Sequence, residues 1–251
     1  MNARAAADTP FRDRLIVGLD LETVAAADAM VERLGDAVRV YKIGKQLFVH
    51  GGPDVVGRIR ARGADVFLDL KFHDIPNTVA GAGAAAARLG VRFFTVHASG
   101  GLAMMKRVVA EVKRVCRRER LSRPQILAVT VLTSLGGAEL RQLGIAGGVE
   151  TQVARLAQLA RRAGCDGVVA SPREITRIRR ACGRDFLIVT PGVRPTWADR
   201  NDQQRVTTPG DAIAAGADFL VVGRPVLAAD DPAGVANEIV AEMARAGDRR
   251  G

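Results

Sequence analysis

The feature that most constrains the fold of this chain is an eightfold alternation of short apolar runs with longer helical segments. The runs stand at LIVGLD (15–20), VYKIG (40–44), DVFLDLK (65–71), FFTVHA (93–98), ILAVTVLT (126–133), GVVAS (167–171), FLIVTPG (186–192) and FLVVGRP (219–225). Such short, β-branched and mostly apolar runs are typical of strands that are buried on both faces of a sheet. Because segments of helical period that end in glycine lie between them, the pattern predicts parallel strands joined by helical crossovers.

The length of the chain decides how these units are arranged. Its 251 residues contain no Pro/Gly/Ser linker, no low-complexity segment and no sequence repeat. A closed (β/α)8 TIM barrel of about 250 residues is of ordinary size. We therefore predict an α/β protein with a single barrel domain over residues 1–251, of which residues 1–12 form a flexible tail. An open, doubly wound sheet is the alternative.

Composition argues against several classes of protein. Although 48% of the residues are hydrophobic, no apolar run approaches the roughly 20 residues that span a membrane. The N-terminal stretch lacks the apolar region of a secretory signal, so we expect a cytoplasmic protein without a membrane partner. Cys116, Cys165 and Cys182 show no CxxC spacing, which argues against a zinc site or a disulfide framework.

The positive charge of the chain raises the question of nucleic acid. The formal net charge is +10, and only 4% of the residues are aromatic. The arginines are dispersed along helical segments rather than clustered, and few aromatic rings are present to stack on bases. We therefore expect no nucleic-acid partner, although the charge can steer small anionic substrates. A basic nucleic-acid-binding protein remains an alternative.

Functional side chains gather where the predicted strands end. All runs except the sixth contribute candidate residues at or just beyond their carboxyl ends. These residues are Asp20, Lys42, Asp69, Lys71, Asp74, His97, Thr133, Ser134, Arg194, Gly223 and Arg224. Because active sites of such barrels lie at the carboxyl ends of the strands, we expect these residues to share one rim.

Four of the charges at this rim are expected to pair. Asp69 and Lys71 are two residues apart, so they share one face of their strand. If that face is the barrel lumen, each needs an opposite charge. Lys42 can supply one for Asp69, and Asp20 can supply one for Lys42. An ion-pair network that only closes the barrel mouth is the alternative, but charges at this rim favour chemistry.

The last two strands predict a phosphate site. Gly223 allows a phosphate to approach the backbone ahead of a helix, and Arg224 can bind it with two hydrogen bonds. Arg194 and Gln203 belong to the long irregular segment 191–210 and can close over the same anion. The residues thus indicate a phosphate ester as substrate. A non-catalytic barrel that binds a phosphate ligand is the alternative, but it would tolerate neutral residues at the strand-three positions.

These residues match a known family. The stretch DLKFHDIPNT (69–78) resembles the Asp-x-Lys-x-x-Asp-Ile-x-x-Thr signature of orotidine 5'-monophosphate decarboxylase. GLD, YKIG, VLTS, TPGVRP and VVGRP resemble the other sequence blocks of that family in the same order, so the likeness extends from about residue 14 to residue 245. It implies the decarboxylation of orotidine 5'-monophosphate to uridine 5'-monophosphate without a cofactor, the final step of de novo UMP biosynthesis.

The resemblance also implies roles for individual residues. Lys71 would donate the proton, Asp69 would face the departing carboxylate, and Asp20 and Lys42 would hold the ribose hydroxyls. Asp74 would reach a shared active site across a homodimer interface. The remaining residues implied to bind the substrate are Thr78, also across that interface, Thr133 and Ser134 at the base, and Arg194, Gln203, Gly223 and Arg224 at the phosphate.

Lys42 separates this reading from a sibling class. Metal-dependent sugar-phosphate decarboxylases and aldolases of the same superfamily are similar at strand three, but they carry a glutamate in place of Lys42 that helps to bind a divalent cation. A lysine there repels a cation and offers a positive charge to Asp69 instead. We therefore expect no metal site.

Overall fold

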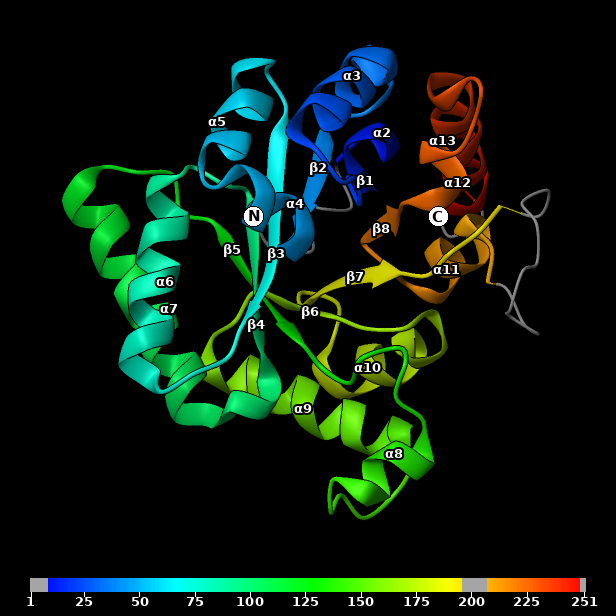
Figure 1. Ribbon diagram of the computed structural model, residues 1–251. Helices are drawn as coiled ribbons and strands as arrows, with labels where there is room; N and C mark the ends of the chain where they lie inside the picture. The colour runs from blue at the N-terminus through cyan, green and yellow to red at the C-terminus, as the bar shows by residue number, and fades with distance from the viewer. Residues whose placement is uncertain (1–8, 196–206, 249–251) are drawn as a thin grey trace.

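The computed structural model describes residues 9–195 and 207–248 and shows eight parallel strands closed into a barrel (Figure 1). The strands are β1 (Leu15–Gly18), β2 (Val40–Gly44), β3 (Asp65–Phe72), β4 (Phe93–His97), β5 (Gln125–Val129), β6 (Gly167–Val169), β7 (Leu187–Pro191) and β8 (Phe219–Val222). Each strand pairs in parallel with the next, and β8 pairs with β1. The predicted TIM barrel is confirmed, and the open sheet is excluded because β1 has a partner on both sides.

Helices surround the barrel because one face of each is apolar. They are α2 (Phe11–Arg14), α3 (Val24–Leu34), α4 (Lys45–Gly51), α5 (Asp54–Ala61), α6 (Pro76–Arg88), α7 (Gly101–Glu119), α8 (Gly137–Gln142), α9 (Val149–Ala163), α10 (Ile175–Cys182), α11 (Pro209–Ala215), α12 (Arg224–Leu227) and α13 (Pro232–Asp248). In α7, Met105, Val108 and Val112 are fully buried at spacings of three and four residues, which is the period of a helix face. None of the described helices has the length and apolar character that a membrane crossing requires.

Part of the expected N-terminal tail is helical. Residues 1–8 lie outside the described residues, but Phe11 and Arg12 already belong to α2. The Phe11 ring packs against the hydrophobic core, and the Arg14 guanidinium lies 4.5 Å from the centre of that ring. Because α2 also contacts α13, this part of the predicted tail is held by the other end of the chain.

The lumen of the barrel has an apolar lower layer and a polar upper layer. Nine buried side chains, contributed by seven of the strands, form the lower cluster: Ile16, Val40, Phe67, Phe93, Leu127, Leu187, Val189, Phe219 and Val221. Two residues further along β2, β3 and β4 stand Lys42, Asp69 and Thr95. Since alternate residues of a strand share one face, these polar side chains enter the lumen at its carboxyl end, above the apolar cluster.

Strand β3 is irregular where its charged residues stand. Leu68 pairs with Phe94 and Phe72 pairs with Val96, so a step of four residues on β3 faces a step of two on β4. Lys71, inside this bulge, has a φ of 56°. Bulges of this kind re-aim side chains and are frequent beside active sites.

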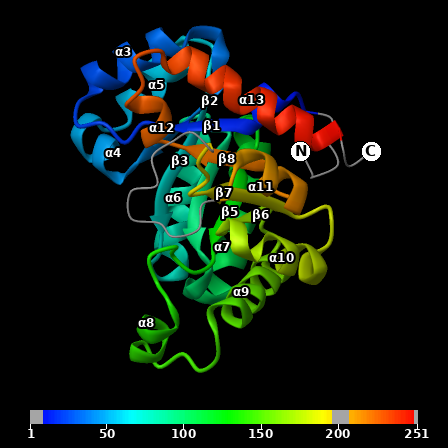
Figure 2. The ribbon, with the colours of Figure 1, turned by 90° about the vertical axis from the view of Figure 1, so that its right-hand side faces the viewer.

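The fifth strand ends earlier than the apolar run predicts. β5 stops at Val129, whereas Thr133 and Ser134 lie in an exposed turn beyond it. The Thr130 amide and hydroxyl both donate to the Val169 carbonyl, at 3.3 and 3.2 Å. Val169 is the last residue of β6, so no further strand partner is available. The chain then leaves the barrel wall towards α8, which projects away from it (Figure 2).

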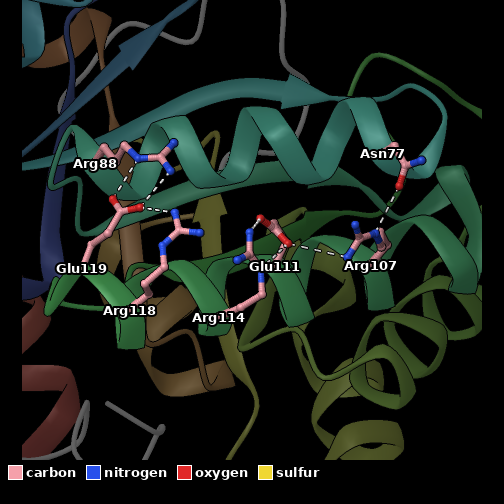
Figure 3. A network of polar contacts seen from close by, with 7 residues as sticks. All are labelled: Asn77, Arg88, Arg107, Glu111, Arg114, Arg118 and Glu119. Atoms are coloured by element: carbon pink, nitrogen blue, oxygen red, sulfur yellow. Dashed lines mark hydrogen bonds and ion pairs between the residues drawn. The ribbon is translucent and has the colours of Figure 1, made fainter.

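Helices α6 and α7 lie side by side and exchange ion pairs (Figure 3). Arg88 of α6 donates to both carboxylate oxygens of Glu119 of α7, at 2.9 and 3.0 Å. At the other end of the pair, Arg107 donates to the Asn77 side-chain oxygen at 3.1 Å. Hydrogen bonds from Arg88 and Arg118 lower the pKa of Glu119 to about 2. Several of the dispersed arginines are thus neutralised on an exposed helix surface, where each pair contributes little to stability.

Candidate active site

The first charged pair at the barrel mouth is Lys42 with Asp20. Lys42 Nζ donates to Asp20 Oδ1 at 2.9 Å. A Cβ atom on Gly18, Gly44 or Gly223 would lie 3.0 to 3.4 Å from atoms of this pair. Asp20 follows β1 and Gly223 follows β8, so the closure of the barrel brings them together. Glycine at the three positions leaves the space that the pair occupies.

The second pair is Asp69 with Lys71. Lys71 Nζ donates to Asp69 Oδ2 at 2.7 Å, and both side chains are largely buried. The expected ion pair between Lys42 and Asp69 is therefore replaced by two separate pairs among the described residues. The reason is local: the bulge in β3 brings Lys71 to Asp69, while Lys42 reaches the carboxylate that follows β1.

Two histidines lie next to the second pair. The rings of His97, at the end of β4, and His73, just after β3, are 5.4 Å apart between centres. Burial lowers the pKa of the His97 imidazole, and the positive fields of His73 and Lys71 lower it further. A neutral His97 is therefore favoured at neutral pH.

Asp74 and Thr78 lie on an exposed segment beyond β3. Asp74 Oδ1 accepts a hydrogen bond from the Ile75 amide at 2.6 Å, and Thr78 stands in the first turn of α6. Both residues are exposed, and Ile75 between them is 68% exposed. Among the described residues, neither side chain has a hydrogen bond or ion pair with the two charged pairs.

The expected phosphate ligands are only partly described. Gly223 directly precedes α12, which begins at Arg224, an exposed residue. The Arg194 amide donates to the Thr207 carbonyl at 3.2 Å, so the two ends of the long segment after β7 meet. Gln203 lies outside the described residues.

Comparison with known proteins adds to this geometry. The family model of the "Orotidine 5'-phosphate decarboxylase / HUMPS family" matches residues 13–239, which include the whole barrel. The chain belongs to the orotidine 5'-phosphate decarboxylase / HUMPS family. Two relatives named orotidine 5'-phosphate decarboxylase are 59% identical (Syntrophotalea carbinolica; 94% of this chain and 96% of the relative) and 54% identical (Geobacter sulfurreducens; 92% and 96%).

Solved structures agree with the fold. The orotidine 5'-phosphate decarboxylase of Lactobacillus acidophilus superposes with a TM-score of 0.82 at 38% identity, over 92% of this chain and 99% of that chain. An uncharacterized conserved protein of Geobacillus kaustophilus superposes with a TM-score of 0.80 at 34% identity, over 91% and 99%.

Within this family site, sequence reasoning missed Thr95. Its hydroxyl donates to Asp69 Oδ1 at 3.0 Å and accepts from the Lys71 amide at 2.9 Å. A signal was present, because Thr95 stands two residues after Phe93 in a strand and so shares its lumen face. A threonine buried at that position needs hydrogen-bond partners. In the sequence, the nearby charged residues indicate the site more strongly than this threonine does.

Proposed function

We propose that this chain decarboxylates orotidine 5'-phosphate to uridine 5'-phosphate and carbon dioxide, the final step of de novo UMP biosynthesis. The observation that carries the proposal is the Lys71 ammonium, held 2.7 Å from the Asp69 carboxylate at the barrel mouth. Family membership and relatives of that name support the same reaction.

Lys71 supplies the positive charge and the proton that the reaction requires. When the carbon–carbon bond to the carboxylate breaks, its electron pair stays on the pyrimidine carbon as a carbanion with little resonance stabilisation. A fixed ammonium stabilises this developing charge and then transfers a proton to the carbon. Lys71 is left neutral and regains its proton from solvent. Asp69 faces the substrate carboxylate, and their repulsion is relieved as carbon dioxide leaves.

Other residues hold the parts of the substrate that do not react. Asp20 and Lys42 present an acceptor and donors to the ribose hydroxyls. The remaining assignments are Thr133 and Ser134 to the base, and Arg194, Gln203, Gly223 and Arg224 to the phosphate. Binding energy from the remote phosphate holds the reacting carbon against Lys71.

We also propose that the enzyme is a cytoplasmic homodimer with shared active sites. Asp74 and Thr78 are exposed, and among the described residues neither is hydrogen-bonded to the charged pairs of its own barrel. Ile75 between them is a large apolar side chain that is 68% exposed, and covering it with a second subunit would be favourable. Asp74 and Thr78 would complete the site of the partner subunit.

The proposed reaction uses neither a metal nor another cofactor. The Lys42 ammonium is paired with Asp20 at the barrel mouth, and its positive charge would repel a divalent cation bound nearby. The metal-dependent sibling reaction is the second candidate. An ultraviolet assay of orotidine 5'-phosphate turnover in excess EDTA separates the two. We expect full activity with EDTA, whereas turnover that requires added divalent metal would contradict the proposal.

A further inference from the structure

The hydroxyl of Thr95 joins the two central residues of the site into a closed ring of contacts. The Lys71 amide donates to Thr95 Oγ1 at 2.9 Å, and Thr95 Oγ1 donates to Asp69 Oδ1 at 3.0 Å. The Lys71 ammonium closes the ring by donating to Asp69 Oδ2 at 2.7 Å. A hydroxyl has one proton to donate and lone pairs to accept, so this arrangement uses both functions of the side chain.

The backbone explains why a side chain is needed here. Lys71 has a φ of 56°, and Arg120, with a φ of 54°, is the other described non-glycine residue with positive φ. Arg120 ends helix α7, where a left-handed residue is common, whereas Lys71 lies inside a strand. The β3 bulge withdraws the Lys71 amide from the regular ladder with β4. The hydroxyl of β4 then takes the place of a backbone carbonyl.

Burial makes these bonds hard to replace. Thr95 is fully buried, and Asp69 is 9% exposed, so water has little access to either. A valine at position 95 has nearly the same shape but would leave the Lys71 amide without its acceptor and Asp69 Oδ1 without its donor. Buried groups that lose a partner rearrange to find another, and here a rearrangement moves the proton donor.

We propose that Thr95 is a positioning residue of the decarboxylation, because its hydroxyl sets the relative placement of the Lys71 ammonium and the Asp69 carboxylate. Thr95 is fully buried and hydrogen-bonds to both residues, so it acts through them rather than on the substrate. The inference rests on the proposed function and adds to it a residue on which turnover depends more than substrate binding.

The chain offers a matched control on β7. Thr190 is also a fully buried strand threonine, but its Oγ1 has no hydrogen-bond partner within residues 9–195 and 207–248. It follows Val189, which belongs to the lumen cluster, so Thr190 points to the outside of the barrel. Removing its hydroxyl tests the general effect of exchanging a buried threonine for valine in this barrel.

The experiment compares wild type with Thr95→Val, Thr95→Ser and Thr190→Val. Steady-state turnover of orotidine 5'-phosphate, calorimetric binding of uridine 5'-phosphate and thermal unfolding are measured for each protein. For Thr95→Val we expect kcat to fall by about 10- to 100-fold, as misplacement of reacting groups by about 1 Å can do, while KM and the product Kd change by less than about threefold. Thr95→Ser, which keeps the hydroxyl, should recover most of kcat, and Thr190→Val should match wild type.

Three results for these variants would contradict the proposal. An unchanged kcat in Thr95→Val, an equal fall in Thr190→Val, or no recovery in Thr95→Ser would overturn the role of the hydroxyl. If Thr95→Val does not fold, Thr95→Cys, of similar size but with a weakly hydrogen-bonding thiol, replaces it with the same expectations. An inactive wild type would overturn the proposed function itself, which the wild-type measurement reveals independently of the variants.

Discussion

At the scale of single residues, Lys71 combines an unfavourable backbone conformation with a side chain whose ammonium is paired with a carboxylate. A left-handed conformation costs a non-glycine residue roughly 1–2 kcal/mol. Here the conformation, with a φ of 56°, persists because the amide binds Thr95 and the ammonium binds Asp69. Strain that is held by surrounding contacts is common at functional sites. These contacts fix the ammonium beside the Asp69 carboxylate.

Replacing Lys71 by alanine tests its role as the proton donor. We expect Lys71→Ala to lower kcat by about 10⁴-fold or more, because charge stabilisation and proton transfer are lost together. Thermal unfolding should change little, since the side chain is partly exposed at the mouth. Lys106→Ala, on the exposed surface of α7, serves as the control and should keep full activity. Substantial turnover by Lys71→Ala would contradict the assignment.

A buried carboxyl group makes stability depend on pH. Glu174, in the turn after β6, accepts a hydrogen bond from the Ser171 amide at 2.8 Å, and burial raises its pKa from 4.5 to about 7. Between these two values the folded protein keeps a proton that the unfolded chain has released. The free energy of unfolding therefore falls as pH rises from 4.5 to about 7, and the full penalty is present above that range.

Glu174→Gln removes this titration while keeping an oxygen for the Ser171 amide. We expect the variant to gain stability relative to wild type on going from about pH 5 to about pH 8, since it escapes the cost of ionising a buried carboxyl group. Denaturant unfolding of both proteins at the two pH values measures the difference. Equal pH dependence of the two proteins would show that Glu174 does not titrate in this range.

At the scale of elements, α10 is tied to the β8 side of the barrel by one arginine. Arg179 Nε and one terminal nitrogen donate to the Gly216 carbonyl at 2.9 and 2.7 Å, and the guanidinium also pairs with Asp218. Asp218, buried at the start of β8, accepts from the Ile188 amide of β7 at 2.7 Å. One ion pair thus links a helix to two strands beneath the active-site mouth.

Breaking this contact should destabilise the whole domain. We expect Arg179→Ala to lower the free energy of unfolding by about 3–5 kcal/mol, because it removes the guanidinium that pairs with the buried Asp218 carboxylate. Arg177 on the same helix pairs with the exposed Glu150, and Arg177→Ala should cost less than about 0.5 kcal/mol. Urea unfolding of both variants gives the comparison. Similar losses of unfolding free energy in Arg179→Ala and Arg177→Ala would show that burial does not raise the cost of breaking an ion pair here.

At the scale of the whole molecule, the apolar cluster in the lumen closes the barrel from below, and the reacting charges lie above it. The segment from His73 to Thr78 is exposed just outside this mouth. Ile75 and Asp74 of this segment are exposed to solvent, and a second subunit could cover both side chains. If the active site is shared between subunits, a mixture of two inactive variants can regain activity that neither variant has alone.

Mixing inactive variants should restore activity if the sites are shared. Lys71→Ala and Asp74→Ala are each expected to be inactive, but a mixed dimer contains one site with both native residues. Equal mixing after reversible dissociation should recover about a quarter of wild-type activity, since half of the dimers are mixed and each has one intact site.

A second mixture provides the control for this experiment. Asp69 and Lys71 contact each other within one barrel, so mixing Asp69→Ala with Lys71→Ala should restore nothing. Recovery in the control, or none in the first mixture, would contradict the shared site. An active Asp74→Ala protein would remove Asp74 from the catalytic set.

The sequence alone determined the architecture and the side of the barrel where the chemistry lies. All eight strands were predicted because a strand buried on both faces shows itself in its own residues. Lys42, Asp69 and Lys71 were assigned to the mouth because alternation along a strand is also a local property. The family was recognisable from the same short stretches.

Only the tertiary structure decided which groups pair. Whether Asp69 binds Lys71 or Lys42, and whether Thr95 takes part, depends on the bulge between β3 and β4. The strand end before Thr133 depends on how short β6 is. These outcomes have one physical reason: a hydrogen bond forms with whichever group another segment brings within about 3 Å, and the periodicity of a single strand carries no information about its neighbour's register.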